Sequence, residues 1–360
     1  MIRASAGRVN ALPIHPRMRG KKHRSRAIGR WTDLCVLPTK RHPECQSPSS
    51  NLQNLPGNAE SRLDLTCGTK FAICSDVRGR LCAVVIFAAA LARVQAASVS
   101  LAEFPFEFRE GLLWVEVKVP QSEKSLNFLV DTGAGVSVIN LSTAKRIGLK
   151  LGREVKVHGV QTMLTGYWQQ RMLARVGEVE LPREYLAVDL DKLSSSCERA
   201  VDGLVGADFF RNRVVQIDFD EKKIRLLKPA KGEKSEASLP LQLRPCGMRV
   251  PITVNGHDRQ WVRLDTGCAT ALQWVTSDVR PEQCGRKMAI GLVEISIPQS
   301  ATTVGIGGHE FGNVPTGLHE TAIFPGEAGL LGNGLLSRFS TVTIDARAAR
   351  VILGQRRSAQ

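Results

Sequence analysis

The chain has 360 residues, of which 43% are hydrophobic and 23% are charged. This globular composition excludes a wholly disordered chain and a collagen-like or coiled-coil rod, and no apolar run reaches the roughly 18 residues of a membrane-spanning helix. The net charge is +15, but residues 1–96 hold 16 Lys and Arg against 5 Asp and Glu, whereas residues 97–360 hold 33 against 29. The basic charge therefore belongs mainly to the N-terminal segment, and we expect no nucleic-acid partner.

Residues 1–76 show no pattern of regular secondary structure. Their apolar residues keep neither the period of a helix nor that of a strand. We expect this basic segment to be disordered or not to be part of the native product. A disordered tail that binds polyanions through residues 17–26 is the alternative, although a charge run is more often simply solvated.

Residues 77–96 have the layout of a secretory signal peptide. Two arginines at 78 and 80 precede the apolar run LCAVVIFAAALA at 81–92, and small residues precede a cleavage site after Ala96. The sequence thus predicts export to the periplasm or the medium, with translation starting near Val77. A buried helix of a folded domain is the alternative, because its apolar run is equally short.

The remaining sequence contains an internal duplication. Three blocks recur in the same order, at 112–119, 127–139 and 201–227 and again at 249–254, 260–272 and 328–353. A charged stretch bounded by Pro and Gly separates the copies. We therefore expect a first lobe at 104–228, a linker at 229–240 and a second lobe at 241–355.

Both copies are predicted to be rich in β-strands. Valines alternate with polar residues along 112–119, the apolar run 128–130 precedes a turn, and 214–219 with 224–227 reads as a hairpin. One short helix is expected at 142–147, with Ser142 as its N-cap and Gly148 closing it. Many short strands with few helices predict an all-β fold for each lobe.

The tripeptide Asp-Thr-Gly occurs once in each copy, at 131–133 and 265–267. Each occurrence follows an apolar strand and precedes, some 70 residues later, two apolar residues and a glycine, at 204–206 and 330–332. A single such tripeptide is an ordinary turn signal. Two copies in the same context indicate a shared functional role.

Residues 104–355 resemble the retropepsin-like aspartic proteases, in the bacterial form with two lobes on one chain. The resemblance rests on DTGAG at 131–135, DTGC at 265–268, and the paired blocks GLVGADFF and GLLGNGLL. It implies two pepsin-like or retropepsin-like β-barrel lobes whose Asp-Thr-Gly loops meet at their interface. It also implies a monomer, because the duplication is an internal pseudo-dimer, and a peptide or unfolded protein as substrate.

Asp131 and Asp265 are the predicted catalytic residues. Peptide hydrolysis by water needs a base to take a proton from the water and an acid to protonate the carbonyl oxygen, and two carboxyls that share one proton supply both. The titration then belongs to the pair, so the sequence assigns neither role to either residue.

Four neighbours are predicted to support this pair. By resemblance, Thr132 and Thr266 tie the two loops together, whereas Gly133 and Gly267 allow the close backbone approach that a Cβ would obstruct. The alternative is that all four are ordinary turn residues.

Substrate is expected to lie extended under a hairpin flap and to pair as an added strand. We expect the first flap within residues 158–169, where Tyr167 and Trp168 are candidate substrate-binding residues, with simple packing as the alternative. Residues 305–308 (GIGG) are a candidate for the flap of the second copy.

The second copy departs from the family pattern by Cys268 after the glycine and by a shorter middle section. A non-catalytic peptide-binding or scaffolding module is therefore the alternative to an exported aspartic endopeptidase.

No histidines have metal-ligand spacing, so we expect no metal and no cofactor. After signal cleavage four cysteines remain, Cys197, Cys246, Cys268 and Cys284, which permit two disulfides in an exported protein.

Overall fold

The computed structural model describes residues 100–159, 162–169, 171–229, 238–277, 286–290 and 293–357. The expected N-terminal segment at 1–76, the expected signal peptide at 77–96 and residues 230–237 of the expected linker lie outside these described residues. The last three residues of that linker form a strand, Ser238–Pro240.

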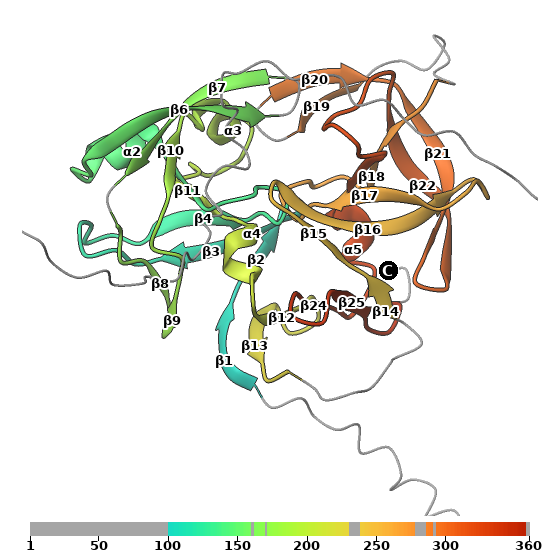
Figure 1. Ribbon diagram of the computed structural model, residues 1–360, viewed down its shortest axis with the longest axis horizontal. Helices are drawn as coiled ribbons and strands as arrows, with labels where there is room; N and C mark the ends of the chain where they lie inside the picture. Colours follow the sequence, from blue (N-terminus) through green and yellow to red (C-terminus); the bar gives the residue numbers. More distant parts are fainter. Residues whose placement is uncertain are drawn as a thin grey trace, which may run out of the picture.

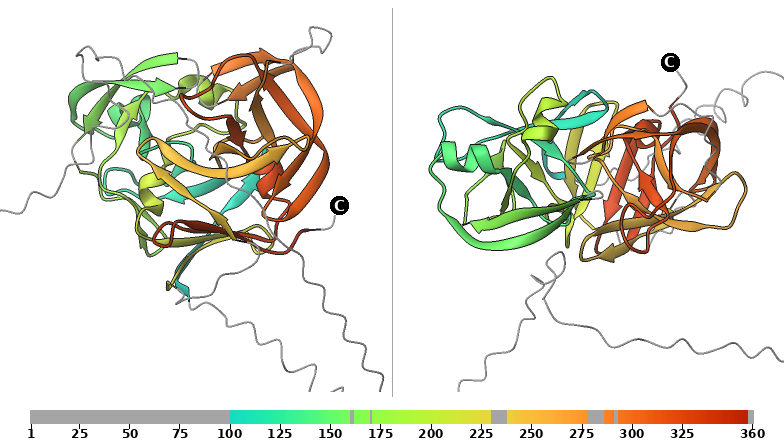
Figure 2. Two further views of the ribbon diagram at one scale, coloured as in Figure 1. Left: turned by 45° about the vertical axis from the view of Figure 1, so that its right-hand side comes forward. Right: turned by 90° about the horizontal axis from the view of Figure 1, so that it is seen from above.

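The described chain folds into two β-lobes that stand side by side (Figures 1 and 2). The all-β fold predicted from the sequence is confirmed. The first lobe is an eight-stranded sheet with the order β2 (Glu107–Arg109), β3 (Leu112–Val117), β4 (Leu126–Val130), β11 (Gly203–Val205), β5 (Val138–Asn140), β10 (Leu186–Val188), β7 (Thr162–Gln169) and β6 (Leu151–Gly159). A two-stranded ribbon, β8 (Arg175–Val176) and β9 (Val179–Glu180), accompanies it.

The second lobe repeats this arrangement. Its seven-stranded sheet has the order β15 (Gln242–Arg244), β16 (Gly247–Val254), β17 (Gln260–Leu264), β23 (Gly329–Leu331), β18 (Leu272–Val275), β22 (His309–His319) and β21 (Gln299–Ile306). Because β16 also pairs with β21, this sheet closes into a barrel. A separate hairpin consists of β19 (Arg286–Ile290) and β20 (Val293–Ile297).

A third sheet joins the two lobes at the bottom of the view in Figure 1. Its order is β1 (Ser100–Pro105), β13 (Lys223–Leu227), β12 (Val214–Asp218), β24 (Thr341–Asp345), β25 (Arg350–Leu353) and β14 (Ser238–Pro240). The hairpin expected at 214–219 and 224–227 is β12 and β13.

The centre of this sheet shows the symmetry of the duplication. In the antiparallel pair β12–β24, Gln216 lies opposite Thr343, and these two residues hold the same position in the two copies. Their side chains are hydrogen-bonded, Gln216 Nε2 donating to Thr343 Oγ1 at 3.1 Å. A pseudo-twofold axis therefore passes through this residue pair and relates the lobes.

Four short helices complete the described fold: α2 (Leu141–Arg146), α3 (Asp191–Ser195), α4 (Ala207–Phe210) and α5 (Asn333–Leu336). The expected N-cap of α2 was wrong. Asn140 caps the helix by accepting from the backbone N–H of Ser142, whereas the Ser142 hydroxyl donates to Asp191 at 3.0 Å. Asn140 ends strand β5 in an extended conformation, which is the geometry that an N-cap requires.

One apolar core extends through both lobes, because alternate residues of each strand point to it. On β4, Leu126, Phe128 and Val130 belong to this core, while Leu129 points to the opposite face of the sheet and packs in a second apolar cluster. The same alternation on β17 buries Val262 and Leu264 in the shared core.

Candidate active site

The two Asp-Thr-Gly loops follow equivalent strands, β4 and β17. The apolar-Gly blocks form β11 and β23, each of which runs parallel to the strand before its loop and antiparallel to the strand after it. The backbone N–H of Asp131 donates to Val205 O, and that of Asp265 donates to Leu331 O, both at 2.9 Å. Each loop is thus held between two strands that the sequence places some 70 residues apart.

The two loops are locked together through their threonines. Thr132 Oγ1 donates to Leu264 O at 2.7 Å and accepts from the Thr266 N–H at 3.1 Å. Symmetrically, Thr266 Oγ1 donates to Val130 O at 2.7 Å and accepts from the Thr132 N–H at 3.0 Å. Both side chains are fully buried, so four hydrogen bonds shielded from water join the lobes at this point.

This lock brings the two carboxyl groups together. Asp265 is buried and Asp131 is half-buried, and each carboxyl acts on the pKa of the other. Asp131 Oδ1 accepts from the N–H groups of Gly133 at 2.9 Å and Ala134 at 3.0 Å. Asp265 Oδ1 accepts from the Gly267 N–H at 2.9 Å. These backbone donors fix the orientation of each carboxyl.

The pKa of both carboxyls is raised. Burial is the main cause in both, and for Asp265 the neighbouring charge of Asp131 raises the pKa further, well above its ordinary value. Backbone donors and the positive charge of Arg263 act in the opposite direction but do not cancel the effect of burial. The pair therefore retains one proton to a higher pH than an exposed aspartate does.

Sequence reasoning missed Arg263, which lies on β17 two residues before Asp265. Its guanidinium is buried and makes a bidentate ion pair with Glu327, in which Nε and Nη2 lie 2.7 and 2.8 Å from the carboxylate oxygens. Its Nη1 donates to the carbonyl oxygens of Gly133 and Cys246, both at 2.7 Å. The one available signal was a charged residue where the first copy has Leu129.

The first expected flap is a hairpin formed by β6 and β7. The two aromatic candidates lie on β7, where Trp168 pairs with Leu186 and Tyr167 with Ala187 of β10. Tyr167 packs against the shared core and Trp168 against the second apolar cluster of the first lobe. Packing is thus the contact that the structure shows for both, and their role in substrate binding stays a prediction.

The residues expected for the flap of the second copy lie on the side of the six-stranded sheet. Gly307 and Gly308 form the turn between β21 and β22, and a Cβ on Gly307 would lie 2.8 Å from Leu353 of the six-stranded sheet. The hairpin β19–β20 instead follows β18 as β6–β7 follows β5, and both hairpins lie on the side of the molecule opposite the six-stranded sheet (Figures 1 and 2). Glycines mark tight turns but not which turn faces a site.

The cysteine beside the second loop is a buried, neutral thiol. Cys268 Sγ lies 3.1 Å from Thr270 Oγ1, and burial raises the pKa of this thiol to about 12. Cys197 and Cys268 carry free thiols, so the two disulfides that four cysteines permit are not both formed. Cys284 lies outside the described residues.

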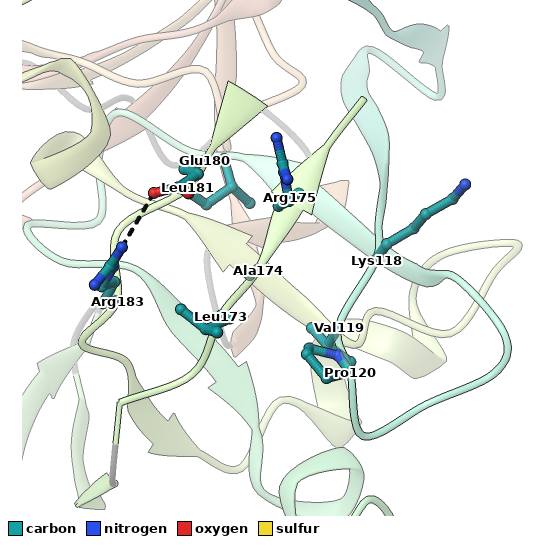
Figure 3. A pocket seen from close by; sticks show the side chains of 9 residues that line it. All are labelled: Lys118, Val119, Pro120, Leu173, Ala174, Arg175, Glu180, Leu181 and Arg183. Atoms are coloured by element: carbon teal, nitrogen blue, oxygen red, sulfur yellow. Dashed lines mark hydrogen bonds and ion pairs between the residues drawn. The ribbon is translucent and has the colours of Figure 1, made fainter. Parts of the chain in front are cut away.

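In the part of the chain that the structure describes, no cluster of three or more His, Cys, Asp or Glu side chains has the geometry of a metal site. A cavity of about 430 Å³ lies on the first lobe between Lys118, Leu173 and the β8–β9 ribbon, where Arg183 pairs with Glu180 (Figure 3). None of the candidate site residues lines it. The paired carboxyls are therefore the centre of the candidate site.

Comparison with protein families gives a match in the first copy. Residues 116–212 match a family model described as gag-polyprotein putative aspartyl protease. This match supports the resemblance of the chain to the retropepsin-like aspartyl proteases. The matched segment includes the Asp131 loop and the apolar-Gly block of the first copy, and similarity to this family supports a peptidase. No curated protein matches the chain, and no helix among the described residues is long and apolar enough to span a membrane.

Proposed function

We propose that this retropepsin-like protein is an aspartic endopeptidase in which Asp131 and Asp265 activate a water molecule. The observation that carries the proposal is the close approach of the two loops: each carboxyl lies against the glycine of the opposite loop and accepts from N–H groups of its own loop. Two such carboxyls that share one proton can act as base and acid in one step.

The reaction begins with water between the ionised carboxylate and the scissile peptide carbonyl. The carboxylate takes one proton from the water while the oxygen attacks the carbonyl carbon, and the protonated carboxyl gives its proton to the carbonyl oxygen. A tetrahedral diol results. Its collapse breaks the C–N bond: the nitrogen receives the proton of the pair, one hydroxyl of the diol gives its proton to the carboxylates as it becomes the product carbonyl, and one shared proton thus remains for the next cycle. The buried position of the pair strengthens each of these electrostatic interactions.

The proposed substrate is a peptide segment in extended conformation. The hairpins β6–β7 and β19–β20 lie on the same side of the two lobes (Figure 1), and an extended chain can pair with a hairpin edge through its own backbone groups. Folded proteins do not offer such a segment, so unfolded proteins or peptides are the substrate class.

A single chain is proposed to suffice. The six-stranded sheet combines β1, β12 and β13 with β24, β25 and the linker strand β14 of the same chain, and both Asp-Thr-Gly loops lie on that chain. A monomer should thus carry the complete pair of carboxyls. Export through residues 77–96 is part of the proposal and rests on the sequence alone; N-terminal sequencing of the exported protein should give a start near Ala97, and an intact Met1 would contradict it.

The function is tested with purified protein of residues 97–360 and a fluorescently labelled unfolded protein. We expect hydrolysis by the monomeric fraction, and inhibition by a peptide in which a hydroxyl-bearing carbon replaces the scissile carbonyl, since this group imitates the tetrahedral diol. Peptide binding without cleavage at any pH between 3 and 8 would contradict the proposal and indicate a peptide-binding module.

A further inference from the structure

We infer that Arg263 is a positioning residue for the paired carboxyls, holding the loop of Asp131 against the second lobe with Glu327 as its anchor. The inference rests on the proposed function, because it assigns Arg263 a part in the same reaction. The hydrogen-bond partners of Arg263 are Glu327 and the carbonyl oxygens of Gly133 and Cys246, so we assign its action to the two loops.

The contacts of Arg263 connect it to both carboxyls. Through Nη1 it donates to the Gly133 carbonyl oxygen at 2.7 Å, and the N–H of the same Gly133 donates to Asp131 Oδ1 at 2.9 Å. Through the backbone, Arg263 stands two residues before Asp265 on β17. One side chain of the second lobe therefore fixes the loop that carries the carboxyl of the first lobe.

Glu327 fixes the guanidinium in this orientation. A buried Arg side chain without a partner is unstable, and the two parallel hydrogen bonds to Glu327 orient the plane of the guanidinium. The ring of Phe324 covers it, with its centre 3.6 Å from Arg263 Cζ. Glu327 is itself 6% exposed and also accepts from Arg249 Nε at 2.9 Å.

The first copy shows that the fold does not need this ion pair. The N–H of Asp202 donates to Asn127 O in the first copy as that of Ala328 donates to Trp261 O in the second, so the two strand pairs are in the same register. In this register, Leu129 corresponds to Arg263 and Val201 to Glu327. Leu129 and Val201 are both buried in an apolar cluster.

An apolar pair is thus sufficient for packing at this place, and the ionic pair of the second copy has another role. A buried ion pair is a weak source of stability, because desolvation offsets most of its attraction. What the ionic pair adds is a donor to the Gly133 carbonyl and a positive charge near both carboxyls. Leucine can supply neither.

The charged and titratable groups around the pair are few in the described structure. The two carboxyls face each other, Arg263 acts on both from β17, and the neutral Cys268 thiol lies beside the second loop. Glu327 and Arg249 stand behind Arg263. A change of charge at Arg263 or Glu327 should therefore shift the pKa values of the two carboxyls.

Two variants test the inference. Arg263→Leu combined with Glu327→Val gives the second copy the apolar pair of the first and should leave the protein folded, while kcat falls about tenfold or more because the Asp131 loop is less firmly placed. Both limbs of the pH profile should move to higher pH, by about half a unit or more, because a positive charge near the carboxyls is gone. Glu327→Gln removes the opposite charge and should move both limbs to lower pH.

Arg225→Leu is the matched control. Arg225 also forms an ion pair within a sheet, with Asp218, but it lies in the six-stranded sheet. The Arg225→Leu variant should have a lower free energy of unfolding and an unchanged pH profile. A residue with only a structural role would lower activity in both test variants without opposite shifts of their profiles.

The titration is followed in parallel by NMR of aspartate carboxyl carbons, which needs no turnover. Opposite shifts of the carboxyl titration in the two test variants support the inference even if the parent protein hydrolyses nothing, in which case only the proposed function fails. Parental kcat and parental pH limbs in a folded Arg263→Leu, Glu327→Val variant, or shifts in the same direction in both variants, would overturn it.

Discussion

Gly133 lies directly against the carboxyl group of Asp265, so that a Cβ at position 133 would come within 2.5 Å of Asp265 Cγ. Gly267 has the same relation to Asp131, also at 2.5 Å. Each loop thus leaves a space, the size of one methyl group, that the carboxyl of the other lobe fills. The glycines are needed for close approach between the loops, and not for an unusual backbone angle, because neither has a positive φ.

Gly133→Ala should therefore abolish most of the activity. The added methyl group must displace the Asp265 carboxyl, and a displacement of about 1 Å at a catalytic group costs on the order of a hundredfold in rate. The measurement is kcat/KM on an unfolded protein substrate. Gly312→Ala is the control, because a Cβ at that position meets no atom within 4 Å; equal activity of the two variants would contradict the close contact.

Thr132→Val should lower both stability and activity. It removes the hydrogen bond to Leu264 O and leaves the Thr266 N–H without its acceptor, so the free energy of unfolding should fall by about 3 kcal/mol. Urea unfolding measures this loss. Thr302→Val is the matched control, since Thr302 is a buried threonine hydrogen-bonded to Thr316 within the second lobe. This variant should lose stability but keep kcat. A similar loss of kcat in both variants would contradict a specific role of the hydrogen bonds between the two loops.

Asp265→Asn should stabilise the protein at neutral pH relative to the parent. The pKa values of both carboxyls are raised in the folded state, so the parent is favoured at low pH and loses stability as rising pH removes the shared proton. The amide carries no charge and can still accept from the Gly267 N–H. Urea unfolding at several pH values should show a difference between variant and parent that grows in favour of the variant from pH 4 to pH 8; a constant difference would show that the pair does not repel.

Ala134→Ser should shift the pH profile of the enzyme to lower pH. The Ala134 N–H already donates to Asp131 Oδ1, and a hydroxyl at the same residue offers a second donor that favours the ionised carboxyl and so lowers its pKa. In the parent neither Ala134 nor the weakly donating Cys268 thiol supplies such a bond. We expect a bell-shaped profile centred in the weakly acidic range for the parent. A strongly acidic optimum, or an unchanged profile in the variant, would mean that another group sets the titration.

The sequence could predict the loops because their constraints are local and occur twice. An apolar strand, an Asp-Thr-Gly turn and a later apolar-Gly block recur in both copies, and the structure brings Asp131 and Asp265 together from these blocks. The six-stranded sheet could not be predicted, because the pairing of Gln216 with Thr343 joins hairpins that are 127 residues apart. Pairing over such separations leaves no local pattern.

Arg263 was missed for a related reason. The alternation of polar and apolar residues along a strand assigns the polar ones to the face exposed to solvent. A buried arginine is therefore predicted to be exposed. Its partner Glu327 is 64 residues away. The glycines at 307 and 308 indicated a turn but not that this turn packs against Leu353 of the six-stranded sheet.

The central claim is that Asp131 and Asp265 together hydrolyse peptide bonds, and it is tested most directly by the turnover of the two single variants Asp131→Asn and Asp265→Asn on an unfolded protein. An amide can neither take the proton of the attacking water nor share one with its neighbour. We predict that each variant loses hydrolysis by about three orders of magnitude or more, while circular dichroism and the monomeric state remain those of the parent. Turnover close to that of the parent in either folded variant would contradict the account.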